Sequence, residues 1–336
     1  MNDELQRKLD AMPNAPAKVD LMAKLASELC ENDTVQAATL CRQAREIAQA
    51  AGYSYGIADC LGILSTCELR LCDYQAALTH AGESQALLMS LGEDGKALRI
   101  DNLIGNIQRR LGDYHSAAEC FRRVHQSARG CGDRLLEASA LNNLGIVYQH
   151  IGDTPAALRY YQDGLALYRE TGETRFCAVG LVNIAEMMHQ SGDLATAGEN
   201  CRQALDIFNA YGDRHGAASA RHLLGRIWRD QGDADRAMDA WHKCLELAQE
   251  IGDSETELRA LTDMALLLVS LGRTSDAFEH LDLAQVIAVG VRDLPILSSL
   301  YGACAELCRR TGDTVVTAEF ERKQEGVEQE LRNQNV

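Results

Sequence analysis

The chain has 336 residues, of which 46% are hydrophobic and only 5% aromatic, and it contains four prolines. Its 33 basic and 49 acidic side chains leave a formal net charge of −16, which argues against nucleic acid and anionic membrane surfaces as partners and would attract basic partners. No segment approaches about 18 uninterrupted apolar residues, so we expect no insertion into a membrane.

The first 16 residues precede the regular pattern, and residues 1–16 are interpreted as an N-terminal extension or cap. They carry neither the basic start nor the apolar stretch of a secretory signal, so a cytoplasmic protein is expected. A short helix over residues 3–11 is expected to be broken by Pro13 and Pro16.

From Ala17 onward, a Gly-Asp pair marks the chain every forty residues, and a second glycine series lies halfway between. Glycine after a helix supplies the left-handed residue that closes it, and aspartate one place later can cap the next helix. The first series is Gly112, Gly152, Gly192, Gly232, Gly272 and Gly312, with Asn32 and Cys72 at the equivalent places. The aspartates are Asp33, Asp73, Asp113, Asp153, Asp193, Asp233 and Asp313, with Arg273 as the exception. The second series is Gly52, Gly92, Gly132, Gly172, Gly212 and Gly252, and Arg292 ends it.

These two series predict an all-α array of eight helix pairs, each helix about 17 residues long. The array occupies residues 17–313, and residues 314–336 form a C-terminal capping helix that leads toward a coiled coil or an output domain if the chain continues. The expected helices are residues 17–31, 34–51, 55–71, 74–91, 95–111, 114–131, 135–151, 154–171, 175–191, 194–211, 215–231, 234–251, 255–271, 274–291, 295–311 and 314–333.

Two columns of small residues recur at a fixed phase of the repeat, and they indicate that helices approach closely there. A glycine inside a helix costs up to about 1 kcal/mol relative to alanine, so its recurrence needs a packing reason. The first-helix column is Ser65, Gly105, Gly145, Ala185, Gly225, Ala265 and Ala305. The second-helix column is Ala37, Ala77, Ala117, Ala157, Ala197, Ala237 and Ala277.

The clearest repeat runs from Ala140 to Glu173 and carries L-G-x-x-Y on its first helix and A-x-x-x-Y on its second. The residues in these patterns are Leu144, Gly145, Tyr148, Ala157 and Tyr161. This unit resembles the tetratricopeptide repeat, lengthened from the usual 34 residues to forty as in variants found in bacterial signalling proteins. The resemblance covers about residues 17–320. It implies a right-handed superhelical solenoid of about eight antiparallel helix pairs, with the first helix of each pair on the concave side.

Sequence motifs for catalysis are absent. The phosphate loop G-x-x-x-x-G-K-[ST], H-E-x-x-H, G-x-S-x-G and a dinucleotide fingerprint after a strand do not occur, so we expect neither an enzyme nor a cofactor. The 12 cysteines form no CxxC motif and are interpreted as reduced, mostly buried thiols. Cys304 and Cys308 lie one turn apart but lack further ligands at suitable spacing, so no metal site is predicted.

A strip of mixed polar and apolar residues on the first helices is the candidate binding site. Residues spaced four, three and four apart share one face of a helix, and asparagine is an unfavourable residue for a helix interior. Asparagine amides can bond a peptide backbone, and arginines can pair with ligand carboxylates. The alternative is that the amides bond a neighbouring helix and the arginines are only solvated. The predicted groove residues are Arg99, Asn102, Asn106, Arg110, Asn142, Asn143, His150, Asn183, Glu186, Arg226 and Arg259.

The C-terminal stretch carries a short heptad-like seam. Val316, Phe320, Val327 and Leu331 are spaced four, seven and four residues apart within a charged run. We expect a helix that caps the last repeat; the alternative is a helix that forms a homodimer or continues into an output domain.

The sequence therefore predicts a protein- or peptide-binding module with a sensory or regulatory role. Ligand binding would favour one of two curvatures of the array and so act on a downstream partner. One alternative is the N-terminal regulatory part of a bacterial signalling enzyme such as a diguanylate cyclase, as the resemblance implies. Another is an assembly scaffold.

Overall fold

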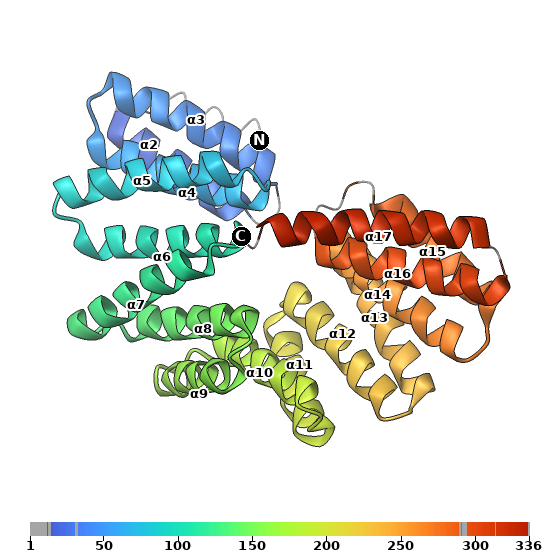
Figure 1. Ribbon diagram of the computed structural model, residues 1–336. Coiled ribbons are helices and arrows are strands. Elements are labelled where there is room, and N and C mark those ends of the chain that lie inside the picture. Colours follow the sequence, from blue (N-terminus) through green and yellow to red (C-terminus); the bar gives the residue numbers. More distant parts are fainter. Residues whose placement is uncertain are drawn as a thin grey trace. The chain divides into compact units, whose positions relative to one another are not determined.

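The computed structural model describes residue 12 and residues 15–30, 33–288, 290, 294–312 and 314–334. Within these ranges every regular element is an α-helix, and most helices are joined by short turns (Figure 1). The all-α class predicted from the forty-residue period is confirmed. The helix expected over residues 3–11 lies outside the described residues, as do Asn32, Arg292 and Asp313.

The described helices fall into two compact units, Met1–Ala157 and Leu158–Val336. The helix α9 (Thr154–Glu170) contains the division between them. The first unit also holds α2 (Ala15–Leu29), α3 (Thr34–Ala50), α4 (Ser54–Arg70), α5 (Tyr74–Ser90), α6 (Asp94–Arg110), α7 (Tyr114–Cys131) and α8 (Arg134–Ile151). The second unit holds α10 (Thr174–Gln190), α11 (Leu194–Tyr211), α12 (Arg214–Asp230), α13 (Ala234–Ile251), α14 (Ser254–Ser270), α15 (Thr274–Ala288), α16 (Leu294–Thr311) and α17 (Thr314–Gln334).

One boundary differs from the expectation for a clear physical reason. Pro16 was expected to interrupt the chain, but α2 begins at Ala15, so Pro16 occupies the first turn of that helix. Proline is tolerated in a first turn because the N–H it lacks would have no partner within the helix. The first helix of the array thus begins two residues before the expected residue 17, and the expected break after residues 3–11 lies outside the described residues.

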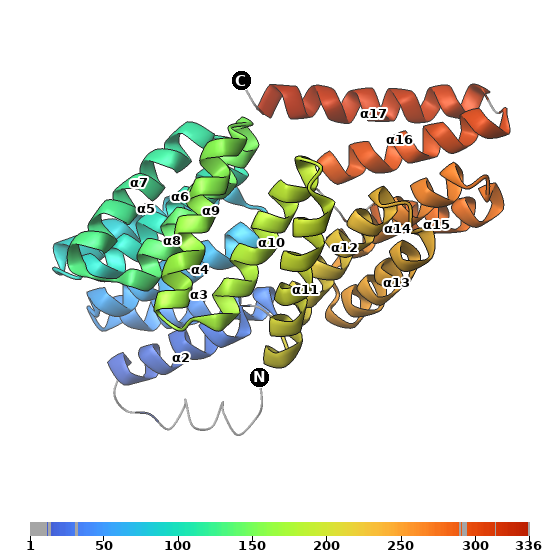
Figure 2. The ribbon, with the colours of Figure 1, turned by 90° about the horizontal axis from the view of Figure 1, so that it is seen from below.

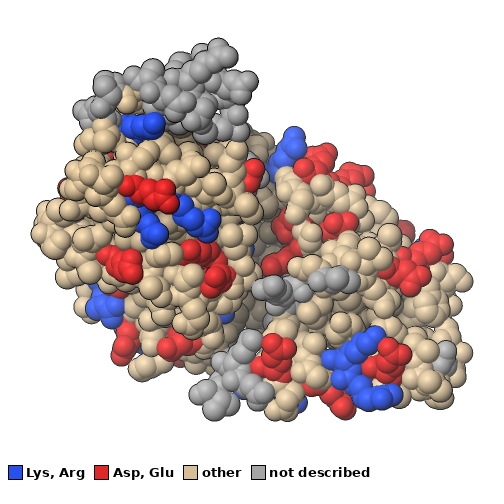
Figure 3. All heavy atoms as spheres, turned by 90° about the horizontal axis from the view of Figure 1, so that it is seen from above, with Lys and Arg blue, Asp and Glu red and all other residues tan. Residues whose placement is uncertain are grey.

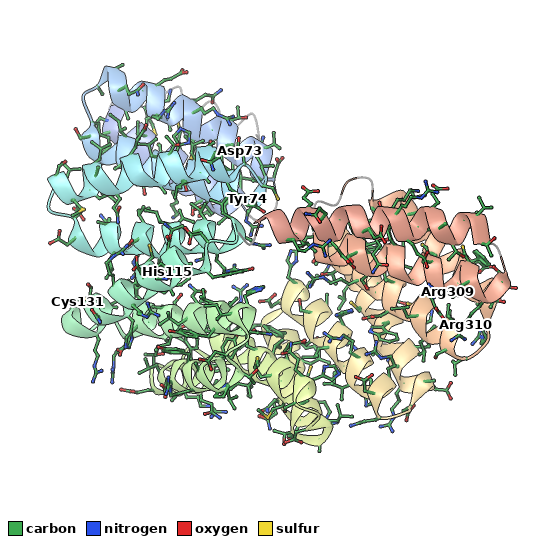
Figure 4. The ribbon with its side chains drawn as sticks, viewed as in Figure 1. Asp73, Tyr74, His115, Cys131, Arg309 and Arg310 are labelled. Atoms are coloured by element: carbon green, nitrogen blue, oxygen red, sulfur yellow. The ribbon has the colours of Figure 1, made fainter. Side chains whose placement is uncertain are left out.

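The turns between helices have the predicted chemistry. Gly112 has a φ of +81°, and Cys72, which occupies the same place one repeat earlier, has a φ of +60°. Asp73, at the start of α5 in Figure 4, accepts a hydrogen bond from the backbone N–H of Ala76 at 3.2 Å. Turns of this kind close one helix and cap the next, whereas α4, α6 and α10 begin after Tyr53, Glu93 and Glu173 without a side-chain cap bond.

The small-residue column of the first helices faces large side chains from the second helix of the same repeat. A Cβ added to Gly105 would lie 2.7 Å from the ring of Phe121, and one added to Gly225 would lie 2.3 Å from Nε1 of Trp241. Both aromatic side chains are fully buried. The predicted close approach is confirmed, and its aromatic partners, Phe121 and Trp241, were not predicted from the sequence.

First and second helices alternate along the chain in each unit (Figure 2). Besides its own partner, a first helix contacts the first helices of neighbouring repeats, as α4 does with α2 and α6, and α12 does with α10 and α14. Side chains one repeat apart therefore meet on the first helices, which is where the candidate groove was placed.

The C-terminal helix α17 packs along α16 (Figures 1 and 2). Phe320 is buried in the core that α17 shares with α14 and α16, and Val316 packs against that core. Arg309, labelled on α16 in Figure 4, donates to Glu321 of α17 at 2.8 Å. The first half of α17 thus covers the last repeat. Among the described helices, none is both long and apolar enough to cross a membrane.

Candidate functional site

Three asparagines of the predicted groove meet in the first unit. Asn143 on α8 donates from Nδ2 to Oδ1 of Asn102 on α6 at 3.1 Å. Asn106 donates from Nδ2 to the backbone carbonyl oxygen of Asn102, one turn earlier in α6, also at 3.1 Å. Asn142 and Asn143 each keep only 8% of their surface exposed. The amides of Asn102 and Asn143 therefore link the first helices of two consecutive repeats.

The pair Asn102–Asn143, here called the amide pair, keeps unused hydrogen-bonding capacity. Nδ2 of Asn102 and Oδ1 of Asn143 have no hydrogen-bond partner among the described residues, and neither atom is sealed from solvent. Exchanging nitrogen and oxygen in both amides would again leave one donor and one acceptor. A donor beside an acceptor is the complement of a peptide group, which presents one C=O and one N–H.

Arg110 and His150 lie at the C-terminal ends of α6 and α8 in the same unit. The His150 ring stacks on Tyr114 with centroids 5.0 Å apart. Desolvation first, and then the positive charges of Arg109 and Arg110, hold the pKa of His150 below its usual value. The imidazole is therefore neutral at pH 7 and can accept a hydrogen bond as well as donate one.

Arginine side chains of the predicted groove are partly engaged by neighbouring repeats. Arg99 on α6 forms an ion pair with the carboxylate of Asp133, at the start of α8, at 2.8 Å. In the second unit, Arg226 on α12 pairs with Glu186 on α10 at 3.0 Å. Arg259 on α14 is exposed, and Asn183 on α10 is half-buried.

The second unit contains a charge network that the sequence analysis missed, here called the α10–α14 network. His189 on α10 contacts Asp230 on α12, with Nε2 and Oδ2 2.7 Å apart. Arg229 donates to Asp230 at 2.8 Å and lies 3.6 Å from Asp263 on α14. His222 on α12 contacts the other oxygen of Asp263, with Nε2 and Oδ2 2.9 Å apart. Five side chains thus connect three consecutive first helices.

Both carboxylates of this network have a pKa below the usual 3.8. Burial alone would raise the pKa of Asp263, but the hydrogen bond with His222 and the positive charges of His222, Arg229 and Arg226 outweigh it. At Asp230, burial is likewise outweighed by the bonds from Arg229 and His189. Both groups are therefore ionised at neutral pH and stabilise the packing of the first helices.

The contacts between repeats follow a step that the sequence analysis did not use. Residues at the same phase are forty apart, yet the pairs Asn102–Asn143, His189–Asp230 and His222–Asp263 are each 41 apart. Several polar contacts between neighbouring first helices are thus one residue out of phase, whereas Glu186 and Arg226 are forty residues apart. Reading the columns at this offset would have identified the α10–α14 network from the sequence.

A cavity of about 440 Å³ opens on the first-helix face of the first unit, here called the Asp59 pocket. Its apolar lining is Ala58, Gly62, Ile63, Leu88, Ile100 and Leu103. Its polar lining is Ser27, Asp59, Thr66, Lys96 and Arg99. Of these residues, only Arg99 belonged to the predicted groove. The volume falls in the range of pockets that hold small ligands or a side chain of a bound peptide.

Acidic and basic side chains lie beside one another on the face shown in Figure 3. In the described ranges, no group of three or more His, Cys, Asp or Glu side chains is arranged to hold a metal ion.

All twelve cysteines are free thiols. Cys131, at the end of α7 in Figure 4, is exposed. Burial raises the pKa of Cys201 and of Cys244 to about 12. Buried thiols of this kind are unreactive at neutral pH.

Comparison with protein families and curated sequences agrees with the repeat pattern. Residues 96–170 and 176–240 match the family model described as tetratricopeptide repeat. The 43 kDa receptor-associated protein of the synapse from Tetronarce californica is 23% identical over 205 residues, which cover 58% of this chain. Those residues cover 48% of that relative, so the chain spans about half its length.

Solved structures share the fold at low sequence identity. A Rap protein complexed with Competence and Sporulation Factor superimposes with a TM-score of 0.75 at 15% identity, covering 99% of this chain and 92% of that chain. The Rap conjugation gene regulator of the plasmid pLS20, in complex with the Phr* peptide, gives a TM-score of 0.68 at 14% identity, covering 94% and 96%. At these identities the similarity establishes the fold alone.

Proposed function

We propose that this tetratricopeptide-type repeat protein is a regulatory module that binds a peptide, or an extended segment of a protein, on its first-helix face. The observation that carries the proposal is the amide pair, which offers one donor and one acceptor at a position linking α6 and α8. The Rap regulator in complex with the Phr* peptide supports it, because a protein of the same fold binds a peptide.

The first-helix face suits a peptide better than a small substrate. A peptide backbone repeats donors and acceptors along its length, and Asn102, Asn106 and Asn143 supply amides along the neighbouring helices α6 and α8. Neutral His150 and the exposed Arg110 extend the polar surface toward the C-terminal ends of the same helices. Binding across several repeats would favour one packing of the first helices over another, which is how such a module would act on a partner.

The test is capture of a random pentapeptide pool by the immobilised chain, followed by mass spectrometry. The double variant Asn102→Ala/Asn143→Ala removes the amide pair and is expected to lower the captured amount about tenfold, the effect of one or two lost hydrogen bonds. Asn209→Ala is the matched control, because Asn209 is exposed on the second helix α11. Equal capture by the double variant and the control would refute the proposal.

The alternatives from the sequence remain predictions of lower support. The matches reported above give no support to the regulatory part of a diguanylate cyclase. For a homodimer through α17, the burial of Phe320 and the packing of the partly buried Val316 against the last repeat occupy half of the proposed heptad seam. The assembly scaffold stays a prediction.

A further inference from the structure

The Asp59 pocket lies beside the amide pair on the same helix. Leu103, which lines the pocket, is the neighbour of Asn102 in α6, and Arg99 lines it one turn earlier. The opposite wall belongs to α4, with Ala58, Asp59 and Ile63. A peptide held by the amide pair would therefore have this cavity within reach of a neighbouring residue or of its end.

The two cations at the pocket are already neutralised. Lys96 pairs with Glu93 at 3.1 Å, and its Nζ lies 4.2 Å from the centroid of the Tyr55 ring. Arg99 pairs with Asp133 at 2.8 Å. Each of the two cations thus already has a carboxylate partner outside the pocket lining.

Asp59 differs from these two residues because its carboxylate is unmatched. The side chain is half-buried and has no hydrogen bond or ion pair with any residue that the structure describes. Burial, followed by repulsion from Asp20, raises the pKa of Asp59, and the positive charge of Lys96 only partly offsets this. A half-buried carboxylate without a partner is costly, and a cation that reached it would remove that cost.

We propose that the Asp59 pocket receives the cationic group of the bound peptide, an ammonium or a guanidinium, while the apolar walls hold the carbon chain that carries it. This inference rests on the proposed function and specifies the ligand as a basic peptide. The apolar lining suits the aliphatic stem of lysine or arginine, which buries its methylenes and keeps its charge at a polar group. A single carboxylate does not suit a divalent metal ion, which needs several oxygen ligands.

The experiment uses the intact chain and a pentapeptide pool with every amino acid except cysteine at each position. The pool is prepared with a free and with an acetylated amino terminus. For the wild-type chain we expect lysine or arginine to be enriched at one position of the captured peptides by about tenfold, which corresponds to about 1.4 kcal/mol. Enrichment in both pools identifies a side chain as the cation, whereas capture from the free-amine pool alone identifies the peptide's α-ammonium group.

Three variants separate the pocket from long-range attraction by the acidic chain. Asp59→Asn is expected to abolish the preference for a cation, and Asp59→Lys is expected to replace it by enrichment of acidic residues. Glu83→Gln changes the net charge as Asp59→Asn does, but Glu83 is exposed on α5, so the wild-type preference should persist. Circular dichroism checks that each variant is folded.

The outcomes distinguish this inference from the proposed function. Equal capture from both pools without a basic preference, or a preference for a cation that survives both Asp59 variants, overturns the assignment of the pocket and leaves peptide binding intact. Failure of the wild-type chain to capture peptides from either pool overturns both.

Discussion

The contact between Gly225 and Trp241 gives the most direct test of how the repeats pack. A Cβ at position 225 would lie 2.3 Å from Nε1 of Trp241 and 2.5 Å from Cδ1. The indole cannot retreat easily, because it is fully buried and its N–H donates to the backbone carbonyl of His222 at 3.1 Å. The variant Gly225→Ala must therefore displace the ring or move α12 away from α13.

The expected cost follows from two opposing effects. Overpacking a core in this way destabilises by about 1–3 kcal/mol. The higher helix propensity of alanine returns up to about 1 kcal/mol. The hydrogen bond from Trp241, which contributes about 1 kcal/mol to the free energy of unfolding, would also be weakened or lost if the ring shifts. We therefore expect Gly225→Ala to lower the free energy of unfolding of the second unit by about 2 kcal/mol.

Gly82 supplies a matched control, because it lies inside α5 with no other atom within 4 Å of an added Cβ. Gly82→Ala is expected to raise stability by about 0.5–1 kcal/mol through propensity alone. Urea denaturation followed by far-UV circular dichroism measures both variants, and hydrogen exchange in α12 and α13 localises the effect. If Gly225→Ala stabilises the protein as Gly82→Ala does, the close approach is not what fixes glycine at this position.

The chain itself suggests a compensating change. One repeat later the same two places hold Ala265 and Leu281, both buried in one core cluster. The double variant Gly225→Ala/Trp241→Leu copies that pair, so its cost should be smaller than the sum of the two single costs by about 1 kcal/mol or more. Additive single costs would contradict the steric explanation.

Three further predictions concern single side chains. Cys72 adopts a left-handed backbone conformation, so Cys72→Gly should raise the free energy of unfolding by about 1 kcal/mol. Gly112→Ala, at the equivalent turn one repeat later, should lower it by a similar amount, and thermal unfolding measures both variants. Asp253 caps α14 by accepting from the backbone N–H of Thr256 at 3.1 Å, so Asp253→Ala should cost about 1 kcal/mol in urea denaturation while Asp253→Asn costs less. The pKa of Asp263 is lower in the folded state than its usual 3.8, so its contribution to the free energy of unfolding is present above pH 3.8 and is lost as pH falls through the folded-state pKa. Asp263→Asn should therefore lower the free energy of unfolding by about 2 kcal/mol at pH 7 and by progressively less in acid. A difference between the variant and the wild-type chain that does not change with pH would contradict this linkage.

Local chemistry made the fold predictable from the sequence. A turn with positive φ favours glycine, and an aspartate at a helix start accepts from an orphan N–H group, so pairs such as Gly112 and Asp113 mark many of the helix boundaries. The start of α2 was predicted two residues late, because proline is tolerated in the first turn of a helix, where Pro16 lies.

The site was less predictable because it depends on contacts between repeats. The phase of one helix identifies which residues share a face, and this placed Asn102, Asn106 and Asn143 together. It does not give the offset at which neighbouring helices meet, so the partner of His189 was missed. The Asp59 pocket was missed for a related reason, because its lining comes from α2, α4, α5 and α6 and no single column contains it.

The two first-helix faces use their polar groups differently, and this bears on where a ligand binds. In the second unit, Glu186 and Arg226 satisfy each other, and Arg229 satisfies both carboxylates of the α10–α14 network. A ligand that bound these groups would have to break existing ion pairs. The network therefore mainly stabilises the packing of α10, α12 and α14 against one another. In the first unit, the amide pair and Asp59 still have unmatched donors, acceptors and charge. A peptide can bond there without that cost, and so the first unit is where we place recognition.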